Sequence, residues 1–109
     1  MSGIKEAKRF CAIVQLDKSS DIKRVAQVAP AVVETIKRWS KGEMEMLCRS
    51  NDGQLFGYIF KSSKPAGMLR VELEKSTVTT NTDNFIVFEL GQDFSGYGFT
   101  RAGTWLQHH

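Results

Sequence analysis

Histidine is almost absent from this sequence, and that bears on catalysis. The only two histidines, His108 and His109, are its last residues, and they are either native or the remnant of a purification tag. Terminal residues are seldom held in one geometry, so neither is suited to act as a general base. Schemes in which a histidine activates a serine or cysteine nucleophile therefore lack their base. The sequence favours a protein without catalysis.

Cysteine is also scarce. Cys11 and Cys48 are the only two, they lie far apart, and neither belongs to a C-x-x-C pair. A disulfide framework or a zinc site needs more Cys or His residues at closer spacing. We therefore expect two reduced thiols, as is usual in the cytoplasm, and no metal or other cofactor.

Long apolar runs are missing as well. No run approaches the ~18 residues that a membrane-spanning helix requires, and the first residues lack the apolar core of a signal peptide. We expect a cytoplasmic protein without a membrane partner. The length of 109 residues fits a single domain, in which residues 1–8 form a flexible N-terminus.

The charged residues that are present are unevenly distributed. Residues 1–41 contain nine Lys or Arg against four Asp or Glu, whereas residues 42–109 contain six against eight. A basic half is compatible with a polyanion such as RNA or DNA, and the same charges also suit the solvated side of a helix. The candidate polyanion contacts are all in the first predicted helix: Lys23, Arg24, Lys37, Arg38 and Lys41.

Alternating apolar residues predict four strands. These are residues 10–16, 43–49, 54–61 and 84–90. The sequence Asn51-Asp52-Gly53 is typical of a hairpin turn, because glycine tolerates the positive φ that such turns require. Residues 66–76 alternate like a strand but fit a short helix equally well.

Apolar spacings of three and four residues predict a helix between Ser20, which would cap it, and Gly42, which ends it. Pro30 lacks an N–H group, so we expect a kink there or two separate helices. A short helix over residues 100–107 closes the chain.

The predicted order of strand, helix, strand, strand, helix, strand resembles the split βαβ, ferredoxin-like sandwich. This resemblance implies an α+β domain with an antiparallel sheet, helices on one sheet face and a short additional C-terminal helix. The second face then needs its own cover, which could be the C-terminal segment, a second copy of the chain or a ligand.

Three aromatic residues are the most informative feature of the predicted strands. Phe56, Tyr58 and Phe60 occupy alternate positions of one strand and therefore share one face of the sheet. The opposite side of that strand carries Leu55, Gly57 and Ile59 and is apolar too, so both sides need cover. We interpret the aromatic side as the open face and as the interface or ligand-binding surface.

Part of this strand resembles a nucleic-acid-binding motif. The sequence Phe56-Gly57-Tyr58-Ile59 is similar to the third-strand consensus of RNA-recognition-motif domains, whose aromatic rings stack on unpaired bases. The resemblance implies a single-stranded nucleic-acid-binding protein that uses Phe56, Tyr58 and the basic first helix. The match covers four residues, and Ala12 occupies the position of a second stacking ring.

Two carboxylates give the one enzymatic alternative. Asp17 follows the first strand and Asp21 starts the first helix, an arrangement similar to that of the small CRISPR-associated ferredoxin-fold nucleases. That resemblance implies Mg²⁺ held by a carboxylate from each of two subunits and cleavage of a phosphodiester. Both residues are also ordinary at a helix start, where Asp caps the helix and favours its dipole.

A glycine-rich segment near the C-terminus offers a further candidate. Ser95, Gly96 and Gly98 precede the last helix, where backbone N–H groups could bind an anion with help from Arg101. The segment matches neither a P-loop nor a dinucleotide-binding fingerprint. The same glycines also suit a tight turn.

Taken together, these patterns predict a small cytoplasmic interaction protein without catalysis. We expect a homodimer joined through the open aromatic sheet face. The alternatives are a single-stranded nucleic-acid-binding protein and a Mg²⁺-dependent nuclease at Asp17.

Overall fold

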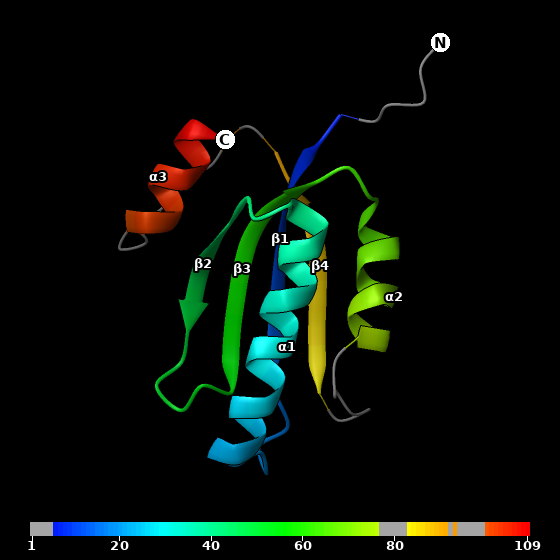
Figure 1. The fold of residues 1–109 in the computed structure, drawn as a ribbon. Coiled ribbons are helices and arrows are strands. Elements are labelled where there is room, and N and C mark those ends of the chain that lie inside the picture. The colour runs from blue at the N-terminus through cyan, green and yellow to red at the C-terminus, as the bar shows by residue number, and fades with distance from the viewer. Residues whose placement is uncertain (1–5, 77–82, 92, 94–99) are drawn as a thin grey trace.

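The computed structural model describes residues 6–76, 83–91, 93 and 100–109. Its centre is a four-stranded antiparallel sheet with the strand order β2-β3-β1-β4, so that β2 and β4 are the outer strands (Figure 1). The strands are β1 (Lys8–Gln15), β2 (Met44–Arg49), β3 (Leu55–Ser62) and β4 (Asn84–Leu90). The prediction of an α+β chain with an antiparallel sheet is confirmed.

Three helices accompany the sheet: α1 (Ile22–Ser40), α2 (Ala66–Ser76) and α3 (Thr100–His108). Figure 1 shows α1 and α2 side by side on one face of the sheet, with α3 apart from them near β2. Residues 66–76, which fitted a strand or a helix, form α2. No helix in the described ranges has the length and apolar composition to cross a membrane.

The start and the middle of α1 differ from the sequence prediction. Asp21 caps the helix, because its side chain accepts a hydrogen bond from the backbone N–H of Arg24, and Ser20 does not take this role. Pro30 lies inside one continuous helix and does not divide it. Pro30 is exposed, so water can reach the carbonyl group that its missing N–H leaves without a helical partner.

The end of α1 and the turn after β2 use positive φ angles. Lys41 has φ 52° and Gly42 has φ 87°, and the N–H of Gly42 donates to the carbonyl of Lys37, which closes the last turn. Gly53 has φ 75° in the predicted hairpin turn, as the sequence Asn51-Asp52-Gly53 indicates.

Two apolar clusters lie on opposite faces of the sheet. The larger is between the sheet and the two helices α1 and α2, and its fully buried members include Phe60, Ile36 and Leu69. The smaller joins Cys11 and Ile59 to Ala102 and Trp105 of α3. Both faces of β1 and β3 are therefore covered in part, which explains why these strands are apolar on both sides.

Candidate functional site

The three aromatic residues of β3 lie in the core and not on an open face. Phe60 is 0% exposed, and Phe56 and Tyr58 are buried with it beneath α1. The ring of Phe60 lies 5.8 Å from that of Phe10 and 5.9 Å from that of Trp39. Burial raises the pKa of Tyr58 as well. The interpretation of this side as the interface or ligand surface therefore differs from the structure. Alternation showed that the rings share a face but not which face the helices cover.

The open face, which we define as the sheet face opposite α1 and α2, is formed by the other set of strand residues. On its β2 side, α3 packs Ala102 and Trp105 over Cys11 and Ile59. Two further contacts hold α3 there. Arg9 donates from Nη1 to the Leu106 carbonyl at 2.9 Å, and Arg101 Nη2 lies 3.2 Å from Glu45 Oε1. Half of the open face thus has a cover from the chain itself.

The cover on the β2 side changes the chemistry of the thiols. Burial, with a smaller contribution from Cys48, raises the pKa of Cys11 to about 11. Burial also raises the pKa of Cys48. Both thiols therefore remain protonated near neutral pH and are weak nucleophiles.

The rest of the open face carries exposed apolar residues, two on β4 and one at the start of β3. Ile86 is 55% exposed, Phe88 38% and Leu55 37%. Ile13, which is half-buried, lies directly opposite Ile86 in the pairing of β1 with β4 and joins these residues into one surface. We call Ile13, Leu55, Ile86 and Phe88 the open-face strip. An uninterrupted apolar surface next to a covered one is typical of a protein contact site.

Gly57 makes the floor beside this strip closely packed. A Cβ atom at Gly57 would lie 3.2 Å from Cys48 Sγ and 3.3 Å from both the Ala12 carbonyl oxygen and Ile13 Cγ1. Glycine therefore allows the side chains of β2 and β1 to meet above β3. The sheet beside the strip is therefore closely packed.

Asp17 and Asp21 take part in a network at the end of β1. The N–H of Asp17 donates to Asp83 Oδ1 at 2.8 Å, and the N–H of Ser19 donates to Asp17 Oδ1. Arg24 forms an ion pair with Asp83, whose side chain is fully buried. The hydrogen bond to Asp83 is the main cause of a raised pKa for Arg24.

This network joins the end of β1, the start of α1 and the residue before β4. Arg24 supplies its positive charge, and Asp21 is used as the α1 cap. Among the described residues, no group of three or more His, Cys, Asp or Glu is placed to hold a metal ion. The arrangement suits a structural tie, and the sequence analysis did not anticipate it because Arg24 and Asp83 are 59 residues apart.

The predicted polyanion contacts do not form one surface with the aromatic rings. Lys23, Lys37, Arg38 and Lys41 are exposed on or just after α1, whereas Phe56 and Tyr58 are buried beneath that helix. Lys23 and Lys37 are separated by about 21 Å along the helix axis. Arg24 is engaged by Asp83. Bases stacked on the rings would therefore not meet these cations.

The predicted anion site near the C-terminus lies mostly outside the described residues. Ser95, Gly96 and Gly98 are among those not described. Arg101 is exposed and forms its ion pair with Glu45 of β2.

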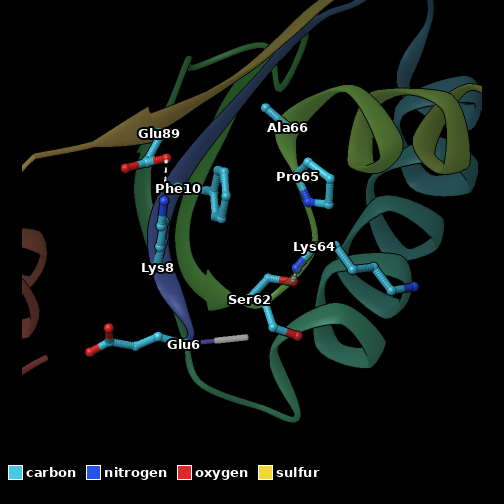
Figure 2. A pocket seen from close by; sticks show the side chains of 9 residues that line it. Glu6, Lys8, Phe10, Ser62, Lys64, Pro65, Ala66 and Glu89 are labelled. Carbon is cyan, nitrogen blue, oxygen red and sulfur yellow. Dashed lines mark hydrogen bonds and ion pairs between the residues drawn. The ribbon is translucent and has the colours of Figure 1, made fainter. Parts of the chain in front are cut away.

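A pocket of about 440 Å³ opens where β1, β3 and the start of α2 meet (Figure 2). Its charged lining residues balance, two lysines (Lys8 and Lys64) against two glutamates (Glu6 and Glu89). Lys8 lies 3.8 Å from Glu89, and Lys64 lies 3.0 Å from Glu72 of α2. The hydroxyl of Ser62 accepts a hydrogen bond from the Lys64 N–H. This balance leaves the pocket without a dominant charge for a ligand to recognise.

No protein-family model matches the chain, and neither a curated protein nor a solved structure matches it. Of the candidate surfaces, the open-face strip is the one on which exposed apolar residues, pairing across neighbouring strands and close packing beneath occur together.

Proposed function

We propose that this protein is a small, non-catalytic, cytoplasmic interaction protein that forms a homodimer through the uncovered part of its open face. The observation that carries the proposal is the open-face strip, where Ile86 and Phe88 are 55% and 38% exposed. The adjacent half of the same face is covered by α3, so the strip is the part that still needs a partner.

We also propose that the fold is a ferredoxin-like sandwich with an added C-terminal helix. In support, α1 and α2 follow β1 and β3 respectively, and the outer strands β2 and β4 flank the central pair. Each of these helices connects two strands that are parallel to one another and separated by one antiparallel strand. This is the arrangement expected of two interlocked split βαβ units.

A protein partner suits the strip better than a nucleic acid. Phosphate contacts require Lys or Arg beside the apolar surface, whereas the polar residues paired at the end of β1 and the start of β4, beside the strip, are Gln15 and Asn84. The exposed basic residues of α1 lie on the helix-covered side of the sheet. Fully burying one large apolar side chain contributes about 1.5–3 kcal/mol, so several residues from two copies can offset the cost of association.

Sedimentation or light scattering over a wide protein concentration range tests the proposal. We expect a dimer that dissociates on dilution and a Phe88→Lys variant that remains folded but monomeric, because a lysine cannot be buried there unpaired. Val71→Lys is the matched control, since Val71 is an exposed residue of α2 on the other face. A native chain that is monomeric throughout would overturn the proposal, as would a dimer equally affected by both substitutions.

A further inference from the structure

β4 is an outer strand of the sheet, and its edge carries few of the features that block strand pairing. Its register with β1 runs without a shift over all seven residues, and in the described part of the chain no strand pairs with its other side. It contains no proline and no lysine, and its one charged residue is Glu89. Edge strands usually carry a proline, several charged residues or a bulge, which prevent pairing with another chain.

The hydrogen-bond pattern shows which backbone groups of β4 point away from the sheet. Leu16, the residue after β1, continues the pairing of β1 with β3, and its N–H donates to the carbonyl of Gln54, the residue before β3. Because hydrogen-bonded pairs alternate along the ladder, the even-numbered residues of β1 are the ones that bond to β3. In an antiparallel ladder the alternate residues bond to the other neighbour. The odd-numbered residues of β1 therefore face β4, as the bond from the Asp17 N–H to Asp83 indicates.

The register of β4 with β1 then fixes the outward groups. Odd residues of β1 pair with even residues of β4, such as Ile13 with Ile86 and Cys11 with Phe88. The N–H and C=O groups of the odd residues of β4 consequently point outward. These are Phe85, Val87 and Glu89.

The outward groups of β4 pair most fully about one position, because only an axis at Val87 gives each of the three outward residues an outward partner within the second β4. If a second β4 approaches antiparallel with the two-fold axis at Val87, then Val87 faces Val87 of the second copy, and Phe85 faces Glu89. Each such pair exchanges two backbone hydrogen bonds, so the three pairs form about six. On the open face, Ile86 then lies opposite Phe88 of the second copy, which buries the two most exposed members of the open-face strip.

The alternative registers are less favourable. An axis at Ile86 or Phe88 would place one of the three outward residues opposite a residue beyond β4. An axis at Glu89 would place two glutamates directly opposite each other, which is destabilising. With the axis at Val87, Glu89 lies opposite an apolar ring and keeps its contact with Lys8 of its own chain.

We infer that two copies of this chain join their β4 strands antiparallel about a two-fold axis at Val87, forming one continuous eight-stranded sheet. The inference rests on the proposed homodimer and specifies its geometry. The open-face strips of the two copies merge across the axis into one surface.

A proline at Glu89 tests the edge contact. Glu89 has an outward N–H and an exposed side chain, so proline removes an intermolecular donor and leaves the bonds to β1 in place. We expect Glu89→Pro to raise the dimer dissociation constant about ten- to thirtyfold relative to Glu89→Ala, because each dimer loses two hydrogen bonds. Equal dissociation constants for these two variants would overturn the inference.

Cross-linking of the native-like dimer tests the register without relying on proline. Residues that face each other in a hydrogen-bonded pair have Cα atoms about 5.5 Å apart, within the range for a disulfide. Val87→Cys should therefore form an intermolecular disulfide under mild oxidation at least about tenfold faster than Ile22→Cys, although Ile22 is far more exposed, at 82%. Faster cross-linking of Ile22→Cys would overturn the register.

Leu55→Lys separates this inference from the proposed function. Leu55 belongs to the open-face strip but lies on β3, two strands from the β4 edge. If Leu55→Lys abolishes the dimer while Glu89→Pro leaves it intact, the two copies meet face to face, the edge inference fails and the proposed function stands. If the native chain is a monomer at every concentration, both fail. If a dimer weakens with Glu89→Pro and persists with Leu55→Lys, the edge pairing is supported.

Discussion

The two outer strands of the sheet, β2 and β4, differ in the features that block strand pairing at their edges. β2 has a register shift between Met46 and Cys48, carries two charged residues, Glu45 and Arg49, and packs against α3. β4 has an unbroken register, one charged residue and exposed apolar side chains on the open face. Bulges, charges and a covering helix are the usual means of blocking an edge. β2 therefore carries the features that block pairing at an edge, whereas in the described part of the chain β4, which packs against α2, carries few of them.

A comparison of two phenylalanines on opposite sheet faces should give the largest effect. Phe60 is fully buried beneath α1, whereas Phe88 is 38% exposed on the open face. We expect Phe60→Ala to lower the free energy of unfolding by about 3–5 kcal/mol. Phe88→Ala should cost the monomer about 1 kcal/mol or less. Urea denaturation at a protein concentration below the dimer dissociation constant measures the unfolding free energy of both variants. Equal losses of unfolding free energy would contradict the assignment of the two faces.

The ion pair next to β4 should give the second largest effect. Asp83→Asn retains an acceptor for the Asp17 N–H but leaves Arg24 without its buried counter-charge. We expect a loss of about 2–4 kcal/mol in the free energy of unfolding. Hydrogen exchange should rise first in β4, because the network holds its start to β1 and α1. The double variant Arg24→Met/Asp83→Asn should lose less than the sum of the single variants, and strict additivity would show that the pair does not act as one unit.

Removing part of the α3 cover should make the β2 side of the open face behave more like the β4 side. Trp105→Ala exposes Cys11, and we expect its alkylation by iodoacetamide at pH 8 to become about tenfold faster. Cys48 in the same sample is the internal reference, read by mass spectrometry. An unchanged ratio of the two rates would mean that Trp105 does not shield Cys11.

The same cover predicts a pH dependence. The folded protein holds the Cys11 proton more tightly than the unfolded chain, because burial raises the thiol pKa from 9.0 to about 11. The resulting stabilisation is complete below about pH 9 and is lost as the pH rises through about 11. The difference in unfolding free energy between the native chain and Cys11→Ala should narrow over that interval, and a constant difference would contradict the burial of the thiol.

The smallest effect is expected for the ion pair that links α3 to β2. Arg101 is 83% exposed, so its contact with Glu45 is screened by water. Arg101→Ala should change the free energy of unfolding by no more than about 0.5 kcal/mol, measured by urea denaturation. A loss comparable to that of Trp105→Ala would mean that charge, and not apolar packing, holds α3 in place.

The sequence predicted where the strands lie better than it predicted which face of each strand is buried. The strand over residues 84–90 and the glycine at the hairpin turn agree with the structure, because alternation and positive φ are local properties. The choice of core face for Phe56, Tyr58 and Phe60 was wrong, since both sides of β3 are apolar and only the placement of α1 decides between them. The role of Asp83 depends on Arg24, which is far away in sequence, and no local pattern indicates the pair.

The sequence predicted an apolar open sheet face but assigned it to the wrong set of residues. An apolar open sheet face was expected, and the structure has one, formed by the strand residues that alternate with the predicted rings. Ile86 and Phe88 were part of a strand recognised as apolar on both sides. The missing information was that α3 covers the β2 half of the open face and leaves the β4 half exposed.

Amide hydrogen exchange along β4 tests the central claim most directly. The outward amides are those of Phe85, Val87 and Glu89, and the inward amides of Ile86 and Phe88 serve as internal controls. At protein concentrations above the dimer dissociation constant we predict that both sets of amides are protected from exchange. On dilution below that constant we predict that only the outward amides lose their protection. Outward amides that exchange rapidly at every concentration, while the inward amides stay protected, would contradict pairing at this edge.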